Sequence, residues 1–483
     1  MTTVHRPEAG GSLVIGGLAR AGGAGAFPVE DPATGAVIAH VADGDTTDAT
    51  AAVDAAHGAL ECWRGTPARA RSEILTRAHQ LMIRDRDRLT ELVMAENGKS
   101  RADALSEITY AAEFFRWYAE EAVRAEGAYG PAPAGGARTL VTHRAVGVAA
   151  LITPWNFPAA MATRKVAPAL AAGCTVVLKP AAETPLTALA IAELLTEAGV
   201  PKGVVNVLPT TDASAVVSTW LNDPRVRKVS FTGSTGVGRV LLRQAAERIV
   251  NSSMELGGNA PFIVTADADL DDAVHGAMIA KFRNGGQACT AANRFYVHSD
   301  IADEFTARFG AEVEALTVGA ASHGAQIGPL ISARAQAGVE ALVEDAVRAG
   351  ARVSHRADVA QSAGYFYPPT VLSDVRFDNP IVASEIFGPV APIVEWTDET
   401  AVLGWANASE MGLAAYVYAR DMQHAIRIAE SLEAGMVGIN RGVVSDPSAP
   451  FGGVKQSGLG REGGRYGLEE FQETQYFSLD WPA

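Results

Sequence analysis

From Val146 onward, short apolar runs alternate with segments of helical pattern. The first run, Val148–Ile152, is bounded by the turn Thr153-Pro-Trp-Asn-Phe-Pro. We expect the helix that follows to end at Gly173, where glycine suits a left-handed cap. Further strands are expected at Thr175–Leu178, Val204–Leu208 and Val226–Phe231. Strands that alternate with helices predict βαβ units and therefore a doubly wound parallel sheet.

The helix after the second of these strands has start and stop signals of its own. We expect Thr184 to cap it, with Pro185 at its first position and Gly199-Val-Pro at its end. The same alternation returns after Glu255, which predicts a second parallel sheet. Its strands are expected at Pro261–Val264, Arg294–His298, Val390–Glu395, Ala415–Tyr418 and Met436–Asn440.

Two extended segments have no neighbour with which to pair. One ends the Gly/Pro/Ala-rich stretch 123–145, and the other is the alternating run that begins at Glu470. The run that begins at Glu470 has no adjacent hairpin turn that would pair it locally. We therefore expect an arm that completes a sheet elsewhere, with another subunit as one possible partner.

Composition narrows the classes of function. The chain has 483 residues, of which 48% are hydrophobic and 20% charged, enough for two or more domains. A net charge of -15 leaves no basic stripe for phosphates, which argues against a nucleic-acid partner. Pro154 and Pro158 interrupt the longest uncharged stretch, which argues against a membrane span.

The cysteines and the first residues indicate a compartment. Cys62, Cys174 and Cys289 are too widely separated to indicate a disulfide framework. The sequence before residue 10 lacks the apolar core of a secretion signal, and no Cys/His cluster has metal-ligand spacing. We expect a cytoplasmic protein without a metal site.

Candidate chemistry centres on Cys289 and Glu255. Each is close to a pair of glycines, which permit backbone turns that other residues resist. A free thiol has a pKa of about 8.5, so a nucleophilic cysteine needs local help. Glu255 could activate either the thiol or a water molecule. Taken alone, a cysteine flanked by glycine is more often an inert buried residue than a nucleophile.

Two loops at successive strand ends favour a nucleotide site. Phe231-Thr-Gly-Ser-Thr-Gly-Val-Gly follows a strand and opens a helix, whose N-terminus can accept a phosphate. Its spacing is not the usual G-x-G-x-x-G, so a structural turn is the alternative. Lys179, at the end of another strand, adds a cation at the edge where open α/β sheets bind ligands.

Taken together, these pieces resemble the aldehyde dehydrogenase superfamily over nearly the whole chain. The resemblance is carried, in order, by Thr153-Pro-Trp-Asn-Phe-Pro, Val177-Leu-Lys-Pro, Phe231-Thr-Gly-Ser, Met254-Glu-Leu-Gly-Gly, Gly286-Gln-Ala-Cys, Glu385-Ile-Phe-Gly-Pro and Pro450-Phe-Gly-Gly. Within the superfamily, the succinate-semialdehyde dehydrogenases are most similar, through Ala162-Thr-Arg-Lys, Lys281-Phe-Arg-Asn, Asn259-Ala-Pro-Phe-Ile-Val and Lys455-Gln-Ser-Gly-Leu-Gly-Arg-Glu-Gly.

The resemblance implies an α/β fold with two doubly wound parallel-sheet domains and a small β arm that builds homodimers or homotetramers. Residues 1–122 and 146–255 would form the coenzyme-binding domain, and residues 256–450 the catalytic domain. Residues 123–145 and 467–483 would form the oligomerisation arm.

The resemblance also implies the mechanism. Cys289 would attack an aldehyde, with the oxyanion held by the Asn156 amide and the Cys289 backbone N–H. Hydride transfer to NADP or NAD would leave a thioester, and Glu255 would activate the water that hydrolyses it. The coenzyme contacts implied are Thr153, Pro154, Trp155, Lys179, Ala182, Gly233, Ser234, Glu385 and Phe387.

The substrate pocket is where this sequence becomes specific. Many family members carry bulky aromatic residues at the positions of Arg164 and Arg283. Burial of two guanidinium groups in a substrate tunnel costs desolvation free energy unless an anion neutralises them. The sequence therefore favours an aldehyde with a distal carboxylate. Close relatives complete that site with a serine that matches Ser445. The alternative is that one arginine pairs with a protein acid such as Asp446.

Two departures bear on coenzyme choice and regulation. Ala182 stands where NAD-preferring relatives often have a ribose-binding glutamate, and we expect Glu183 to face solvent, so NADP is favoured over NAD. Ala291 replaces a second cysteine found in several relatives, which excludes a local disulfide with Cys289.

Several alternatives remain at this stage. Succinate and glutarate semialdehyde differ by one methylene, worth only about 1–3 kcal/mol. A broader aldehyde dehydrogenase, a CoA-acylating relative and a non-catalytic protein on the same scaffold are the other readings. CoA-acylating relatives generally lack the glutamate that Glu255 supplies, and a non-catalytic protein would not need Cys289, Glu255 and Asn156 together.

Overall fold

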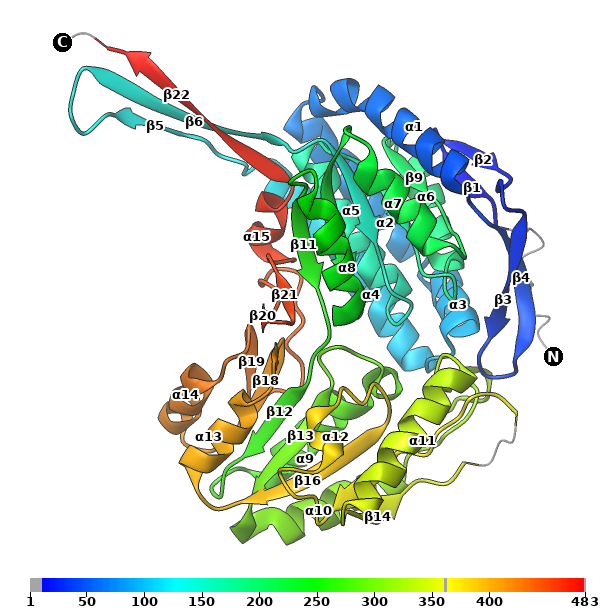
Figure 1. The fold of residues 1–483 in the computed structure, drawn as a ribbon, viewed down its shortest axis with the longest axis vertical. Helices are drawn as coiled ribbons and strands as arrows, with labels where there is room; N and C mark the ends of the chain where they lie inside the picture. Colours follow the sequence, from blue (N-terminus) through cyan, green and yellow to red (C-terminus); the bar gives the residue numbers. More distant parts are fainter. Residues whose placement is uncertain (1–10, 360–362, 482–483) are drawn as a thin grey trace.

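The structure, a computed structural model, describes residues 11–359 and 363–481. Its first sheet has eight strands in the spatial order β2-β1-β9-β8-β7-β10-β11-β21 (Figure 1). The central strands β9, β8, β7, β10 and β11 are parallel. The strands of this sheet are β1 (Leu13–Ile15), β2 (Leu18–Arg20), β7 (Val148–Ile152), β8 (Thr175–Lys179), β9 (Val205–Val207), β10 (Val226–Thr232), β11 (Asn251–Glu255) and β21 (Gly458–Leu459).

Helices cover both faces of this sheet because its strands are apolar on both. In β7, Val148 and Ile152 pack on one face, and Ala149 and Leu151 on the other, as a period of two requires. The first face is covered by α1 (Thr46–Arg64), α7 (Ala213–Asn222) and α8 (Thr235–Ala246). The second is covered by α2 (Ala68–Arg84), α3 (Arg86–Asn97), α4 (Arg101–Ala122), α5 (Pro158–Ala172), α6 (Leu186–Glu197) and α15 (Gly464–Glu469).

The second sheet has seven strands in the order β14-β15-β16-β13-β12-β18-β19, and all except the edge strand β14 are parallel. Its strands are β12 (Ala260–Val264), β13 (Ala292–His298), β14 (Arg352–Arg356), β15 (Thr370–Ser373), β16 (Val390–Trp396), β18 (Ala414–Tyr418) and β19 (Met436–Ile439). The expected doubly wound α/β class, with two parallel sheets, is therefore confirmed.

The helices of the second sheet also lie on both faces. One face carries α9 (Leu270–Phe282) and α10 (Ser299–Glu314). The other carries α11 (Ala333–Arg348), α12 (Pro380–Ala383), α13 (Glu399–Asn407) and α14 (Met422–Ser431). Two small antiparallel pairs complete the body, the hairpin of β3 (Ala26–Asp31) with β4 (Ala36–Ala42), and β17 (Met411–Gly412) with the distant β20 (Val454–Lys455).

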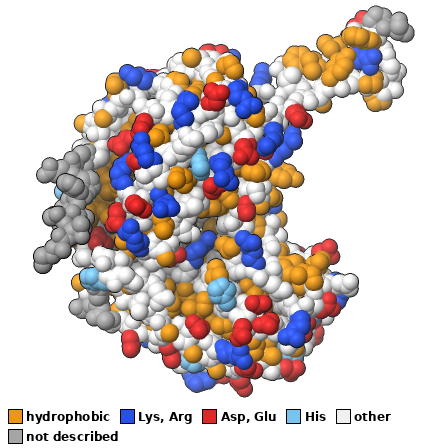
Figure 2. Space-filling model, turned by 180° about the vertical axis from the view of Figure 1, so that it is seen from behind, with side chains coloured by type: hydrophobic (Ala, Val, Ile, Leu, Met, Phe, Trp, Pro, Cys, Tyr) orange, Lys and Arg blue, Asp and Glu red, His pale blue; other side chains and the backbone are white. Residues whose placement is uncertain are grey.

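The two extended segments pair with each other, and the first of them also has a local partner. β22 (Gln472–Asp480) runs antiparallel to β6 (Ala137–Ala145), which also pairs with β5 (Ala128–Pro131). This three-stranded sheet projects from the body as an arm (Figure 1). Hydrophobic side chains are visible along the projecting arm (Figure 2).

One expected helix start is wrong. α6 begins at Leu186, and the Thr184 side chain makes no cap; its hydroxyl donates to the Trp155 carbonyl at 3.4 Å instead. The two first N–H groups of α6 donate to Glu96, which is buried in α3. A carboxylate distant in sequence has thus replaced the local cap, which a local pattern cannot reveal.

The strand order of the first sheet reverses direction at β7. The chain passes from β7 to β8 and β9 on one side, and β10 then lies on the other side of β7. Open α/β sheets bind ligands at such a switch point, at the carboxyl ends of the strands.

Candidate active site

Most of the predicted coenzyme contacts lie at this edge of the first sheet. The loop that begins at Thr153 follows β7, Lys179 ends β8, Gly233 follows β10, and Glu255 ends β11. Because these strands are parallel, their carboxyl ends meet at one edge. The predicted residues placed here are Thr153, Pro154, Trp155, Asn156, Lys179, Ala182, Gly233, Ser234 and Glu255.

Glu385 and Phe387 reach the same place from the loop between α12 and β16. Glu385 Oε1 accepts the Gly258 N–H at 3.1 Å. The Phe387 ring packs edge-on against Trp155, with ring centroids 5.5 Å apart. Phe387 holds a positive φ of 50°, an uncommon conformation for a bulky residue that the surrounding packing must maintain.

Cys289 follows a left-handed turn. Asn284, Gly285 and Gly286 have φ of 54°, 60° and 75°, and a Cβ on Gly286 would lie 2.2 Å from the Gly388 carbonyl oxygen. Gly258, on the opposite side, has room only for hydrogen, because a Cβ there would lie 2.2 Å from the Cys289 carbonyl oxygen. The two glycine pairs noticed in the sequence are therefore points of close backbone approach.

The Asn156 side chain is held with a free donor. Its Nδ2 donates to the Gln287 carbonyl at 3.1 Å, which leaves one amide hydrogen available. Its backbone carbonyl accepts from the Lys99 ammonium at 2.7 Å and from Asn284 Nδ2 at 2.9 Å. The Asn156 amide and the segment before Cys289 are thus linked by hydrogen bonds.

Beside Cys289 lies a cavity of about 230 Å³. Its lining includes four predicted residues, Cys289, Arg164, Arg283 and Ser445. The structure therefore brings the candidate nucleophile and all three candidate carboxylate-binding residues to one cavity.

Helix α4 supplies one wall of this cavity, which the sequence did not reveal. Asp103, Ser106, Glu107 and Tyr110 line it, at the i, i+3, i+4 and i+7 positions that share one face of a helix.

Arg164 is buried, with 2% of its surface exposed, and only part of its guanidinium is satisfied. Its Nη2 donates to the Tyr110 hydroxyl at 2.7 Å, and its plane lies 4.0 Å from the Phe451 ring centroid. Nε and Nη1 have no hydrogen-bond partner. The nearest carboxylate oxygen, Glu462 Oε2, is 3.6 Å from Nη1.

The arginines do not pair with Asp446. That carboxylate accepts two hydrogen bonds from Ser448 and is exposed. Arg283 has its guanidinium 5.2 Å from the Phe157 ring centroid, and it forms no ion pair within the described chain. Glu462, the acid that does approach Arg164, is shared with Lys165, which forms an ion pair with it.

Burial controls the protonation of both candidate catalytic groups. It raises the pKa of the Cys289 thiol to about 12, although Arg164 opposes the shift. It also raises the pKa of Glu255 well above its usual range, with the Glu462 charge adding to the effect. Neither carboxyl oxygen of Glu255 has a hydrogen-bond partner within the described chain. The Cys289 thiol is therefore protonated at neutral pH in the free protein, and burial favours the protonated form of Glu255.

Sequence reasoning missed Lys165 and Glu462, which lie near Glu255. Glu462 and Lys165 change the pKa of Glu255 in opposite directions. Lys165 directly follows Arg164 in the quoted motif, and it is fully buried. Two successive cations on a helix of mostly apolar residues could have signalled a buried acidic partner.

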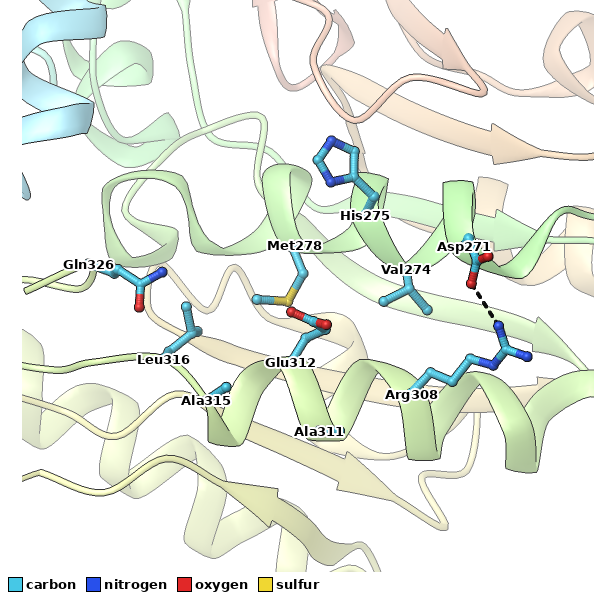
Figure 3. A pocket seen from close by; sticks show the side chains of 10 residues that line it. All are labelled: Asp271, Val274, His275, Met278, Arg308, Ala311, Glu312, Ala315, Leu316 and Gln326. Atoms are coloured by element: carbon cyan, nitrogen blue, oxygen red, sulfur yellow. Dashed lines mark hydrogen bonds and ion pairs between the residues drawn. The ribbon is translucent and has the colours of Figure 1, made fainter.

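A larger cavity, of about 670 Å³, lies between α9 and α10 (Figure 3). It shares no lining residue with the Cys289 cavity, and Asp271 and Arg308 in its wall pair with each other at 2.7 Å. Within residues 11–359 and 363–481, no helix is long and apolar enough to span a membrane, and no cluster of His, Cys, Asp and Glu could hold a metal ion.

A candidate nucleophile beside the carboxyl edge of a parallel sheet is an arrangement typical of a coenzyme-dependent enzyme. Comparison with known proteins gives the class of this protein. The sequence model of the aldehyde dehydrogenase family matches residues 19–477. The chain belongs to the aldehyde dehydrogenase family. The motif-based resemblance and the expected aldehyde substrate are thereby confirmed.

Several relatives carry names that specify a substrate. A succinate-semialdehyde dehydrogenase of Paenarthrobacter nicotinovorans is 52% identical over 92% of this chain and 99% of its own length. The NADP(+) succinate-semialdehyde dehydrogenase GabD of Escherichia coli is 47% identical, over 97% of both chains. A glutarate-semialdehyde dehydrogenase of Pseudomonas putida is 48% identical over 93% of this chain and 94% of its own.

Among solved structures, succinate-semialdehyde dehydrogenase from Burkholderia pseudomallei superposes with a TM-score of 0.95 at 46% identity. The match covers 98% of both chains, so the architecture is shared throughout.

Proposed function

We propose that this enzyme oxidises an aldehyde with a distal carboxylate, succinate semialdehyde first of all, to the corresponding acid. The observation that carries the proposal is the Cys289 cavity with its two arginines. Arg164 presents two buried nitrogen atoms without hydrogen-bond partners, although Nη1 lies 3.6 Å from Glu462 Oε2. Arg283 has no ion pair within the described chain. A substrate carboxylate would satisfy both groups, whereas an uncharged aldehyde would satisfy neither.

The named relatives support the same class of substrate. They include succinate-semialdehyde and glutarate-semialdehyde dehydrogenases at similar identity. Glutarate semialdehyde, one methylene longer, is therefore the second candidate, because a single methylene changes binding by only about 1–3 kcal/mol.

The residues at the sheet edge fit a dinucleotide coenzyme. The buried Lys179 ammonium has no hydrogen bond or ion pair within the described chain, and burial lowers its pKa to about 8. The N-terminus of α8 lies at the same edge. Lys179, Ala182, Gly233 and Ser234 would hold the adenosine and phosphate groups, and Glu385 and Phe387 the nicotinamide end. When bound, the coenzyme accepts the hydride from the substrate.

We propose that this coenzyme is NADP in preference to NAD. Ala182 supplies no carboxylate that would repel a 2′-phosphate, and Glu183 is exposed. Lys179 offers a positive charge beside that position. The relative GabD, whose name specifies NADP(+), supports the preference.

In the proposed mechanism, the Cys289 thiol gives its proton to the ionised Glu255, which releases it to solvent, and the sulfur attacks the carbonyl carbon. The developing oxyanion accepts hydrogen bonds from Asn156 Nδ2 and the Cys289 backbone N–H. After the hydride has left, a thioester on Cys289 remains. Glu255 then removes a proton from water, whose oxygen displaces the sulfur and gives the acid. The Asn156 amide retains one hydrogen for this purpose.

We also propose a role for each domain and a cellular compartment for the enzyme. The segments 1–122 and 146–255 bind coenzyme, residues 256–450 carry the nucleophile, and the arm of 123–145 and 467–483 joins subunits into a homodimer or homotetramer. The three cysteines are unpaired, which suits a reducing compartment such as the cytoplasm.

A steady-state assay tests the proposed substrate. We expect the value of kcat/KM for succinate semialdehyde to exceed that for butanal, and to fall in Arg164→Leu and Arg283→Leu by about 10- to 100-fold, since a charged hydrogen bond is worth roughly 1.5–3 kcal/mol. Butanal oxidation should change little. Arg116→Leu, an exposed arginine on α4, is the control. Equal losses on both aldehydes would show that the arginines are structural.

The same assay with each coenzyme tests the coenzyme proposal. NADP should give the higher value of kcat/KM in the parent, and Ala182→Glu should shift the preference toward NAD. A tenfold or greater advantage for NAD in the parent enzyme would overturn the NADP assignment.

A further inference from the structure

The polar groups of the Cys289 cavity differ in how many of their hydrogen bonds are made with the protein itself. Its two acids, Glu107 and Asp103, both accept hydrogen bonds from the protein. Glu107 accepts from Lys99 at 2.6 Å and from the N–H groups of Ala159 and Ala160 at 2.8 and 3.2 Å. Asp103 Oδ2 accepts from Ser100 Oγ at 3.0 Å and from the Asn284 N–H at 3.1 Å. These carboxylates are therefore fixed to the protein framework and partly neutralised.

The hydrogen-bond donors of the cavity, in contrast, lack protein acceptors for some of their hydrogens. Arg164 retains two nitrogen atoms without hydrogen-bond partners, of which Nη1 lies 3.6 Å from Glu462 Oε2. Ser445 makes no side-chain hydrogen bond within the described chain. Tyr110 belongs with these donors. Its hydroxyl oxygen accepts from Arg164 Nη2 at 2.7 Å, and no protein acceptor for its own O–H occurs among the described residues.

The Tyr110 ring is fixed before any ligand arrives. It packs edge-on against Phe114, one helical turn along α4, with ring centroids 4.9 Å apart and an interplanar angle of 71°. The Arg164 guanidinium lies 5.7 Å from the Tyr110 centroid and 5.4 Å from that of Phe114. A hydroxyl that accepts from a cation also becomes a stronger donor, because hydrogen bonds in a chain polarise one another.

We propose that Tyr110 is a specificity-determining residue that donates its O–H directly to the distal carboxylate of the substrate, alongside Arg164, Arg283 and Ser445. This inference rests on the proposed function. Tyr110 has a double role in it, because the same oxygen accepts from Arg164 and fixes the orientation of that guanidinium. An uncharged aldehyde offers no acceptor at this end of the cavity and gains nothing from either role.

The test is Tyr110→Phe, which removes one oxygen and keeps the ring that packs on Phe114. We expect KM for succinate semialdehyde to rise about tenfold or more, as for loss of a hydrogen bond to a charged group, with KM for butanal and the melting temperature unchanged. The inhibition constant of succinate, which reports carboxylate binding without turnover, should rise by a similar factor. Tyr466→Phe, an exposed tyrosine on α15, is the matched control.

The double variant Arg164→Leu/Tyr110→Phe separates a direct contact from an indirect one. If Tyr110 donates to the substrate, the double variant loses more affinity for succinate than Arg164→Leu alone. Equality of the two would overturn the direct contact, as would an unchanged or equally raised KM on both aldehydes in Tyr110→Phe. Failure of the proposed function has a different signature, since the parent enzyme would then show no preference for succinate semialdehyde over butanal.

Discussion

We expect the half-buried Cys289 thiol to react poorly in the free protein. Burial raises its pKa to about 12, and the Arg164 and Arg283 charges offset only part of that shift. At neutral pH the thiolate fraction is therefore very small, and the nucleophile must be activated after the ligands bind. Glu255, itself buried and without a hydrogen-bond partner, is the base that could accept the proton.

This protonation state predicts how the free protein reacts with an alkylating reagent. The rate of Cys289 alkylation by iodoacetamide should rise with pH through pH 9 without a plateau, because the thiolate fraction grows until pH exceeds the pKa. Mass spectrometry of a Cys62→Ser variant would follow Cys289 alone, because Cys174 is buried. A plateau below pH 8 would contradict the raised pKa.

Substitution of Glu255 should separate the two halves of the reaction. Glu255→Gln keeps the size of the side chain but cannot take a proton from water, so hydrolysis of the thioester should slow by a factor on the order of 10²–10⁴. One burst of reduced coenzyme should remain in stopped-flow absorbance. Glu247→Gln, at an exposed position at the C-terminal end of α8, serves as the control. An undiminished steady-state rate in Glu255→Gln would mean that Glu255 is structural.

The sequence indicated much of this site, but only where motifs were available. Cys289, Arg164, Arg283 and Ser445 were placed together through a family resemblance, and the structure places them at one cavity. Tyr110 was missed because it is 54 residues from Arg164 and its helix carries no motif. A helical pattern shows which residues share a face, but not which distant element that face will meet.

At the scale of elements, α6 illustrates how a long-range contact replaces a local signal. Thr184 and Pro185 have the residue types of a helix start, yet the first two N–H groups of α6 donate to Glu96 at 2.7 and 3.0 Å. The contact lies just after Ala182 in the chain. Glu96 therefore holds the loop that we assign to the adenosine end of the coenzyme.

The stability that Glu96 contributes should depend on pH. Burial raises its pKa from 4.5 to about 7, so the native state binds a proton more tightly than the unfolded chain. The native state is then favoured most at low pH, and this part of the stability is lost as pH rises from about 4.5 to 7. Glu96→Gln, which cannot titrate, should lose less melting temperature between pH 5 and pH 8 than the parent protein.

The control for this prediction is Glu61→Gln, an exposed glutamate on α1. Its melting temperature should follow that of the parent at both pH values. If the melting temperatures of Glu96→Gln and the parent depended on pH in the same way, Glu96 would not titrate with a raised pKa.

For the whole molecule, alternation of apolar strands and helices was sufficient to predict two parallel sheets. Every strand expected from Val148–Ile152 to Met436–Asn440 occurs, with ends that differ by one or two residues. The relative placement of the sheets could not be predicted in this way. It depends on contacts such as that of Glu385 with the Gly258 N–H, which no local pattern encodes.

The arm carries aromatic side chains that a single chain leaves uncovered. Tyr476 and Phe477 are 59% and 38% exposed, and because they are successive residues of β22 they point to opposite faces of the arm. Tyr129 on β5 is 61% exposed. Exposed apolar groups on a projecting sheet are typical of an interface, which supports the proposed homodimer or homotetramer.

A charged side chain on the arm should therefore weaken the association of the subunits. Burial of one large apolar side chain is worth about 1.5–3 kcal/mol, and a buried carboxylate without a partner costs more, so Tyr476→Glu and Phe477→Glu should each weaken one face of the interface. Light scattering after size-exclusion chromatography should give two or four times the chain mass for the parent and less for both variants. Phe377→Glu, which changes a 49% exposed aromatic residue on the body, should leave the mass unchanged. A monomeric parent, or two arm variants with the parent's mass, would rule out the arm as the subunit contact.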